Sequence, residues 1–206
     1  MHVLLINGSP HKKGCTYTAL SEVAGQLEKN GITTNIFHIG NKPIRGCIAC
    51  GACKDTGLCI FNDDPVNEGI DLLKQADGVV VGSPVYYAGP NGSICAFMDR
   101  LFFLKSGPYA YKPAAAVVSC RRGGASASFD RLNKYFTISC MPIVSSQYWN
   151  SVHGNTPEEV RQDREGLQIM RTLGDNMAWL LKCIDAARGT VPYPVREAWT
   201  PTNFIR

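Results

Sequence analysis

The sequence predicts an α/β fold in which a doubly wound, five-stranded parallel sheet carries helices on both faces. Two observations predict it: five short apolar segments, and helix-forming segments that alternate with them along the chain. Strands buried on both faces are continuous apolar runs, and parallel strands need right-handed crossover connections. A length of 206 residues fits one domain. We therefore expect a single domain over residues 1–206, with a cysteine-rich loop at 45–64 and a C-terminal helix and tail at 157–206.

Five segments are predicted as strands. Residues 2–7 and 78–82 are almost continuous apolar runs, and each ends at a Gly-Ser-Pro turn. Residues 33–39 alternate in polarity and are rich in β-branched side chains, whereas residues 114–119 and 141–145 are short apolar runs.

Helices are predicted between and after these strands. Apolar residues recur at helical spacing in residues 16–30, 66–76, 93–104 and 127–136. A proline in the first turn opens a long helix over residues 157–187, and a proline-rich tail follows it. The alternation of strands and helices places any ligand outside the carboxyl ends of the strands.

Composition and charge exclude several classes of protein. With 45% hydrophobic and 18% charged residues, the chain is neither disordered nor fibrous. Its net charge of +4 is scattered, without the basic run of a nucleic-acid-binding arm, so no nucleic-acid partner is expected. No apolar run approaches the roughly 18 residues of a membrane helix, so we expect a cytoplasmic protein without a membrane partner. In that compartment its nine cysteines are more often metal ligands, catalytic or buried than disulfide-bonded.

The segment after the first strand, residues 8–16, is suited to bind an anion. A loop that leads into a helix presents backbone N–H groups and the positive end of the helix dipole. In this segment and the first turn of the predicted helix, the side chains with hydroxyl groups are Ser9, Thr16 and Thr18, and the basic side chains are His11, Lys12 and Lys13. The P-loop and the Gly-x-Gly-x-x-Gly patterns are absent, which disfavours ATP hydrolysis and a dinucleotide-binding Rossmann site. An ordinary strand-to-helix turn remains the alternative.

Two further loops are expected at the same edge of the sheet. Residues 82–90 follow the third strand and residues 119–124 follow the fourth. Tyr86 and Tyr87 offer flat faces and hydroxyls to a planar ligand, and the glycines at 123 and 124 allow close approach of the backbone. The three loops together predict a site for a phosphorylated, planar molecule.

The loop sequences resemble a known family. Gly8-Ser9-Pro10, Gly14-Cys15-Thr16 and Gly82-Ser83-Pro84-Val85-Tyr86 are similar to the FMN-binding loops of the flavodoxin-like NAD(P)H-dependent FMN reductases, and the similarity extends to about Ser145. Within that superfamily the chain most resembles the iron–sulfur flavoproteins, which commonly carry Gly-Ser-Pro-Arg-x-x-Gly-Asn-Thr in the first loop. His11 and Cys15 replace the arginine and the asparagine here, and the second change removes a side-chain amide.

The resemblance implies a flavodoxin-like sheet with the strand order 2-1-3-4-5. It also implies an oxidoreductase in which bound FMN takes a hydride from NADH or NADPH and passes electrons to a small acceptor, such as a quinone or free flavin. No catalytic side chain is implied, because the flavin N5 atom carries the chemistry. The family is usually dimeric or tetrameric, so a homodimer or homotetramer is expected.

The resemblance assigns parts of FMN to the three loops. The phosphate is assigned to Ser9, His11, Gly14, Cys15, Thr16 and Thr18. One edge of the isoalloxazine ring is assigned to Pro84, Val85, Tyr86 and Tyr87, and the other to Ser119, Cys120, Arg121, Arg122, Gly123 and Gly124. Arg121 or Arg122 would place positive charge near the flavin N1 and O2 atoms.

A second motif lies in the loop at 45–64. Cys47, Cys50, Cys53 and Cys59 have the spacing C-x2-C-x2-C-x5-C. Four thiolates bind a [4Fe–4S] cluster or a zinc ion, and two consecutive gaps of two residues favour the cluster. The iron–sulfur flavoproteins carry a compact motif of this kind in the same place. The alternatives are that these four cysteines form disulfides in an oxidised sample or stay as free thiols.

The other cysteines carry weaker expectations. The start of the helix is expected to lower the pKa of Cys15. Cys95, Cys140 and Cys183 are expected to be small buried hydrophobic residues. Cys120 is expected either to touch the flavin or to pack in the core.

Three functions therefore remain, with the FMN-dependent oxidoreductase first. The second is an electron-transfer protein with FMN and a [4Fe–4S] cluster that accepts electrons from a ferredoxin. The third is a non-catalytic redox sensor in which the four cysteines respond to oxidant. Turnover of NAD(P)H separates the first from the other two.

Overall fold

The computed structural model describes residues 1–103, 107–198 and 200–202. The strands are β1 (His2–Asn7), β2 (Thr33–His38), β3 (Gly78–Tyr86), β4 (Gly89–Pro90), β5 (Ala114–Cys120) and β6 (Ser151–His153). The helices are α1 (Cys15–Lys29), α2 (Cys53–Thr56), α3 (Val66–Gln75), α4 (Gly92–Phe103), α5 (Ala125–Ile138), α6 (Pro157–Val160) and α7 (Arg164–Ala186), with a 3-10 turn at Gly107–Tyr109. The predicted end of the third helix at Leu104 lies outside the described residues.

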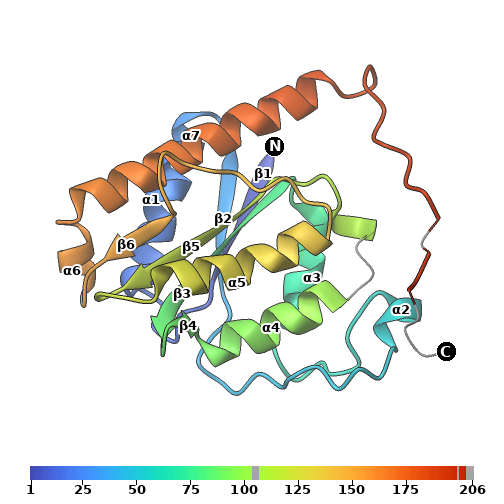
Figure 1. Ribbon diagram of the computed structural model, residues 1–206, viewed down its shortest axis with the longest axis horizontal. Helices are drawn as coiled ribbons and strands as arrows, with labels where there is room; N and C mark the ends of the chain where they lie inside the picture. Colours follow the sequence, from blue (N-terminus) through green and yellow to red (C-terminus); the bar gives the residue numbers. More distant parts are fainter. Residues whose placement is uncertain (104–106, 199, 203–206) are drawn as a thin grey trace.

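The sheet has the order β2-β1-β3-β5-β6, and β4 pairs antiparallel with β3. All neighbours in the main order are parallel. The predicted α/β doubly wound fold is therefore confirmed, with six strands in place of five. Figure 1 shows that β3 and β5 run side by side in the same direction.

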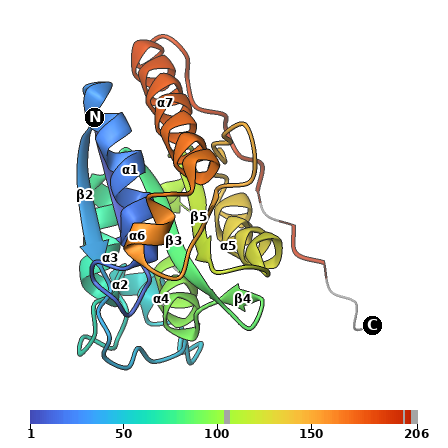
Figure 2. The ribbon, with the colours of Figure 1, turned by 90° about the vertical axis from the view of Figure 1, so that its left-hand side faces the viewer.

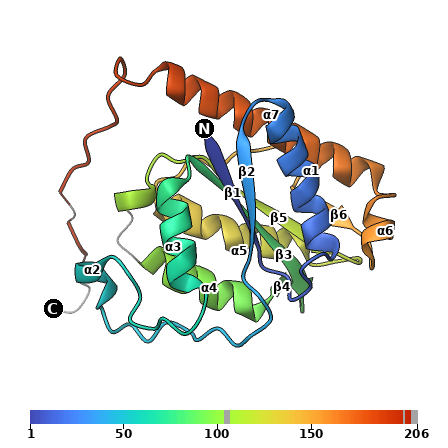
Figure 3. The ribbon, with the colours of Figure 1, turned by 180° about the vertical axis from the view of Figure 1, so that it is seen from behind.

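Helices cover both faces of the sheet, with α1 and α7 on one face and α3, α4 and α5 on the other (Figures 1 and 2). Strand β1 shows why, because alternate side chains of a strand point to opposite faces. Val3 and Leu5 pack with α1 and α7, whereas Leu4 and Ile6 pack with the other three helices. A continuous apolar run thus supplies both halves of the core. Seen from behind, α1 and α7 lie side by side (Figure 3), where the Gln26 amide donates to Asp175 at 2.8 Å.

The prediction of a strand at residues 141–145 is wrong. This segment makes a single parallel bridge, between Ile143 and Ala114. The Ala114 N–H donates to the Pro142 carbonyl at 2.9 Å, and the Val144 N–H donates to the Ala114 carbonyl at 2.8 Å. The chain then leaves the sheet and returns as β6.

An asparagine covers the edge of β5 between that bridge and β6. The Asn150 side-chain amide donates to the Ala116 carbonyl at 3.1 Å, and the Val118 N–H donates to the Asn150 carbonyl at 3.0 Å. Asn150 is buried, so these bonds satisfy groups that water does not reach. The Asn150 side chain therefore supplies a hydrogen bond that a neighbouring strand would otherwise make. A pattern of apolar residues does not predict such a contact.

The predicted helix over residues 157–187 is divided. Helix α6 is capped by Thr156, whose hydroxyl accepts from the Glu159 N–H, and α7 is capped by Asp163, whose carboxylate accepts from the Gly166 N–H at 2.9 Å. An aspartate at the N-cap favours a new helix start. Among the described residues, no helix combines the length and hydropathy that a bilayer crossing needs.

Candidate functional site

The loop between β1 and α1 is fixed by its own polar groups. The Ser9 N–H donates to Asn7 Oδ1 at 3.1 Å, and the His11 N–H donates to Ser9 Oγ at 3.1 Å. The Asn7 amide also donates to the Lys12 carbonyl at 3.2 Å. A turn with this many internal bonds is ordered before a ligand arrives, so less conformational entropy is lost on binding.

Neighbouring elements hold the same loop from outside. The Gly8 N–H donates to the Gly82 carbonyl at 2.9 Å, and the Asn91 side-chain amide donates to the Gly8 carbonyl at 2.5 Å. His38, at the end of β2, hydrogen-bonds through Nε2 with the Ser9 carbonyl at 2.8 Å. The loop is thus attached to β2, to β3 and to the segment that leads into α4.

Asn91 gives a prediction about stability. This buried residue also accepts from the Ile94 N–H at 2.8 Å. Asn91→Ala is expected to lower the free energy of unfolding by roughly 2–4 kcal/mol, because it leaves two buried backbone groups unpaired. Urea denaturation measures the change, with Gln168→Ala on the exposed side of α7 as the control, expected within about 0.5 kcal/mol of the parent protein. Equal stability of the two variants would contradict the role given to Asn91.

The start of α1 is open towards this loop. Its N-cap, Gly14, has no side chain to bond the first N–H groups, and the first turn has no acidic residue. The first internal bond of the helix runs from the Thr18 N–H to the Gly14 carbonyl at 3.0 Å. The preceding N–H groups therefore face out of the helix end, where the helix dipole favours an anion. The arrangement suits a phosphate group.

Two buried hydroxyls lie beside the open helix end. Thr16 Oγ1 and Ser119 Oγ are 2.8 Å apart, although the residues are 103 positions apart in sequence. Gly82 makes room for the Thr16 and Leu20 side chains, since a Cβ there would lie 2.8 Å from Thr16 Cγ2 and 2.8 Å from Leu20 Cδ1. The structure thus brings together the ends of β1, β3 and β5, as the topology predicts.

The remaining residues of the first predicted loop differ in exposure. His11 is exposed, and the Thr18 hydroxyl donates to the Gly14 carbonyl at 3.2 Å within the helix. The Cys15 thiol donates to the Gly154 carbonyl at 3.7 Å. Burial raises the pKa of Cys15 and outweighs the opposing backbone hydrogen bond. The expectation that the helix start lowers this pKa is therefore wrong.

The raised pKa predicts slow alkylation of Cys15. The thiolate is the reactive form, so a thiol whose pKa is raised reacts slowly near neutral pH and faster as the pH increases. Iodoacetamide is expected to modify Cys15 several-fold more slowly than the exposed Cys183. Peptide mapping by mass spectrometry over a time course measures both rates in one sample. Faster reaction at Cys15 would contradict the assigned environment.

The predicted loop at residues 82–90 is mostly strand: residues 82–86 end β3, residues 89–90 form β4, and Tyr87 and Ala88 are the turn between them. Tyr86 and Tyr87 are exposed, and Pro84 and Val85 are half-buried. Tyr87 and Ala88 have positive φ values of 48° and 59°, which are uncommon for residues other than glycine. The backbone is thus strained at the turn, and the two tyrosine side chains next to it are open to solvent.

The loop after β5 packs against the turn between β3 and β4. Gly124, at φ 89°, precedes α5, and a Cβ on it would lie 2.7 Å from Ala88 Cα. Ser119 and Cys120 are buried, while Arg121, Arg122 and Gly123 are exposed. Burial raises the pKa of Cys120, whose thiol donates to the Arg122 carbonyl at 3.7 Å. The two arginines thus stand at the open side of the site.

A pocket of about 420 Å³ adjoins these loops. Its lining comprises Pro10, Gly40, Asn41, Pro43, Ile44, Tyr86, Asn91, Gly92 and Ser93. Residues 40–44 were not among those predicted. They follow β2, so the rule that strand carboxyl ends share one edge would have indicated them.

The four cysteines of the loop at 45–64 gather around a second, smaller pocket. It is lined by Cys47, Cys50, Cys53 and Cys59 together with Ile48, Gly51, Ile60, Phe61, Arg100 and Phe103. Burial raises the pKa of Cys53, and the charges of the other three thiols add to the rise. The spacing therefore places all four sulfur atoms in one neighbourhood.

The four thiols are not assembled around one point in this structure. Among the described residues, no three Cys, His, Asp or Glu side chains converge closely enough to hold one metal ion. Zinc needs its thiolates about 2.3 Å from a common centre, whereas a four-iron cluster binds one thiolate at each iron and spreads them apart. Four thiols are the donors that a [4Fe–4S] cluster and a zinc ion both use, so the chemistry of the donor set fits either group.

Helices α3 and α4 hold the cysteine loop in place. The Cys59 N–H donates to Asn67 Oδ1 at 2.7 Å, and the Asn67 amide donates to the Cys59 carbonyl at 2.9 Å. From α4, Arg100 donates to Cys59 Sγ at 3.2 Å and forms a buried ion pair with Asp64. Burial alone would lower the pKa of Arg100, but these two partners outweigh it and the pKa is raised. Neither anchor was predicted; the signal for Arg100 is a charged residue within an apolar helical segment.

The remaining cysteines depart from the expected burial. Cys95 is half-buried, and Cys140 and Cys183 are exposed. Cys140 follows the end of α5 with a positive φ of 53°, which turns it out of the core. Cys183 lies on the outward side of α7. The prediction that all three are buried is therefore wrong.

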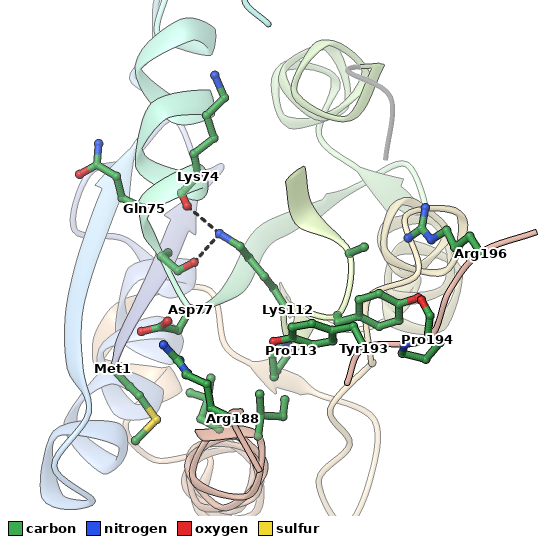
Figure 4. A pocket seen from close by; sticks show the side chains of 15 residues that line it. Met1, Lys74, Gln75, Asp77, Lys112, Pro113, Arg188, Tyr193, Pro194 and Arg196 are labelled. Carbon is green, nitrogen blue, oxygen red and sulfur yellow. Dashed lines mark hydrogen bonds between the residues drawn. The ribbon is translucent and has the colours of Figure 1, made fainter. Parts of the chain in front are cut away.

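A pocket of about 540 Å³ lies at the opposite end of the sheet (Figure 4). Met1, Asp77 and Pro113, which precede β1, β3 and β5, line it. The Lys112 ammonium donates to three carbonyls at the end of α3, at 2.6–2.9 Å. The tail closes the other side, where Tyr193 stacks on Tyr111 with ring centroids 5.1 Å apart. The lysine is thus engaged in joining helix and sheet, away from the predicted site.

Comparison with known proteins agrees with the geometry. The family described as NADPH-dependent FMN reductase matches residues 1–156. An iron-sulfur flavoprotein of Methanocaldococcus jannaschii is 32% identical over 192 residues, covering 89% of this chain and 99% of the relative. An iron-sulfur flavoprotein of Methanosarcina thermophila is 26% identical, covering 91% of this chain and 99% of the relative.

Solved structures share the fold. RosB, crystallised with the bound intermediate 8-demethyl-8-formylriboflavin-5'-phosphate, superposes with a TM-score of 0.71 at 15% identity, covering 100% of this chain and 94% of RosB. A flavodoxin from the domain Archaea gives a TM-score of 0.60 at 15% identity, covering 88% of this chain and 99% of the flavodoxin. The fold is therefore flavodoxin-like. Together with the family match, it shows that the chain belongs to the NADPH-dependent FMN reductase family of oxidoreductases.

Proposed function

We propose that the protein is an FMN-dependent oxidoreductase that takes a hydride from NADH or NADPH and passes electrons to a small acceptor such as a quinone or free flavin. One observation carries the proposal: the open start of α1 lies beside the buried pair Thr16–Ser119 at the carboxyl edge of the sheet. Family membership supports it, since the family is described by NADPH and FMN.

The phosphate of FMN would be held by the first loop. The N–H groups at the start of α1 would donate to it, and Ser9, His11, Gly14, Cys15, Thr16 and Thr18 would surround it. No acidic residue stands in the first turn to oppose a dianion. Binding at a helix start combines N–H donors with the helix dipole.

The ring would lie between the second and third loops. FMN, when bound, supplies the N5 atom that accepts and releases the hydride. Tyr86 and Tyr87 would stack on or border the ring, and the exposed Arg121 and Arg122 would stabilise negative charge on its pyrimidine side. The residues of this chain thus bind and orient, and none is required as an acid or base.

A cluster on Cys47, Cys50, Cys53 and Cys59 belongs to the same proposal. Their common pocket supports it, as do the relatives named iron-sulfur flavoproteins. Such a cluster would exchange single electrons, and this favours a second candidate function, electron transfer from a ferredoxin to FMN.

Steady-state oxidation of NADH and NADPH separates the two functions. The holoprotein is mixed with each nucleotide and with a quinone or free flavin, and the loss of absorbance of the reduced nucleotide is followed. Catalytic turnover with either nucleotide is the expected result. Absence of turnover together with reduction of the flavin by reduced ferredoxin would favour the electron-transfer function instead.

A further inference from the structure

Arg100 is a buried arginine, with a side chain 1% exposed, in the last turn of α4. Arginine is almost never fully buried unless its guanidinium is paired. Nothing in the flavin site explains it, because the residues near that site lie at the other end of α4, at Gly92 and Ser93. Its burial therefore needs a reason at its own end of the helix.

Within the part of the chain that the structure describes, the hydrogen bonds of its guanidinium all go to the cysteine-loop segment, residues 45–64. Through Nη1 it donates to the Arg45 carbonyl at 3.2 Å and to the Asp64 carboxylate, and through Nη2 to the Phe61 carbonyl at 3.2 Å. Through Nε it donates to Cys59 Sγ at 3.2 Å. One side chain thus joins the beginning and the end of the loop and touches one of the four sulfur atoms.

Fastening the loop does not by itself require this buried ion pair. Asn67 already binds the backbone at Cys59, and it also donates to the Phe61 carbonyl at 3.2 Å. A buried ion pair gives little net stability compared with apolar residues of the same volume, because both charges lose their hydration. An apolar residue in place of Arg100, however, could not donate an N–H to the Cys59 sulfur.

We propose that Arg100 is a positioning residue that fixes the Cys59 sulfur and raises the reduction potential of the group held by the four cysteines. This inference rests on the proposed [4Fe–4S] cluster. Reduction adds negative charge to a cluster, and hydrogen bonds to its sulfur atoms are one of the factors that set its potential. A cationic donor in a buried place stabilises the reduced form more than the oxidised form, so the potential rises.

Asp64 provides a second variant, which should shift the reduction potential in the opposite direction. Its carboxylate neutralises Arg100, with both side chains at most 3% exposed. Asp64→Asn would leave the donor to Cys59 in place and remove the opposing negative charge. The potential is therefore expected to rise in this variant and to fall in Arg100→Met. If the ion pair were only structural, both variants would instead lose iron, without opposite shifts in potential.

The test is a redox titration of the anaerobically purified holoprotein, monitored by electron paramagnetic resonance of the reduced cluster. Four variants are compared with the parent: Arg100→Met, Arg100→Lys, Asp64→Asn and, as a matched control, Arg164→Met at an exposed position on α7. We expect a lower potential for Arg100→Met, partial recovery for Arg100→Lys, a higher potential for Asp64→Asn and no change for Arg164→Met. Iron and FMN are assayed on each sample.

The possible outcomes distinguish a failure of this inference from a failure of the proposed function. A parent protein with a cluster whose potential is unchanged by Arg100→Lys and Asp64→Asn would overturn the role of Arg100 and leave the proposed function intact. A parent protein without iron would overturn the cluster and this inference together. If Arg100→Met fails to fold, the opposite shifts of Arg100→Lys and Asp64→Asn still decide the question.

Discussion

Thr16→Asp is expected to abolish retention of FMN. The substitution places a carboxylate at the start of α1, beside the position proposed for the phosphate dianion. Like unit charges about 4 Å apart near a protein surface repel by about 4 kcal/mol, which corresponds to a roughly 1000-fold loss of affinity. The FMN released on denaturation, measured by fluorescence against the protein concentration, gives the result.

Two conservative variants serve as controls for this prediction. Thr16→Ser keeps the hydroxyl that pairs with Ser119 and should retain FMN, whereas Thr16→Val removes it and should bind more weakly. Circular dichroism establishes that each variant is folded, which matters because Thr16 is only 1% exposed. A folded Thr16→Asp protein that purifies with its full complement of flavin would show that the phosphate lies elsewhere.

Cys50→Ser is expected to remove the cluster and spare the flavin. A serine hydroxyl is a poor substitute for a thiolate ligand of iron. Cys50 is exposed, so the substitution should cost little stability. The iron and sulfide content of the variant is expected to fall to a small fraction of that of the parent, while its FMN content stays the same.

Cys183→Ser is the matched control, because Cys183 is an exposed cysteine on α7, outside the cysteine loop. Its iron content should equal that of the parent. Iron that is unchanged in Cys50→Ser would show that this cysteine is not a ligand. Loss of FMN along with the iron would show that the two sites are not independent.

Much of the fold follows from the sequence because the central strands are buried on both faces. Strands β1, β3 and β5 contain the predicted apolar runs: β1 and β5 match the predicted segments to within one residue, whereas β3 continues four residues beyond its predicted end and pairs with β4. Parallel strands with alternating helices leave few topologies, and the observed order is one of them. The three loops of the candidate site could be predicted for the same reason, since the strand ends place them together.

The edge of the sheet could not be predicted in this way. Residues 141–145 have the composition of a strand, but the pairing they would make is taken over by the Asn150 amide and then by β6. Strand β6 has only three residues and no apolar run to mark it. Tertiary contacts that replace backbone pairing with a side chain leave no periodic pattern in the sequence.

The partners of the residues that anchor both sites could not be predicted from sequence patterns, although the charge of Arg100 within an apolar helical segment marks that residue. Asn91 and Arg100 act through contacts to Gly8 and Cys59, 83 and 41 positions away. Each is a single polar residue next to an apolar helical stripe, a position usually exposed to solvent. Only the packing of α4 against the two loops shows what they bind.

The most direct test of the proposed function is the cofactor content of the protein purified without oxygen. Its absorption spectrum, FMN and iron are measured on the same sample. We predict flavin bands with FMN and chain in equal amounts, a broad additional absorbance, and about four iron per chain, as a [4Fe–4S] cluster requires. A folded protein without flavin would contradict the proposal at its centre, and flavin without iron would limit it to a simple FMN reductase.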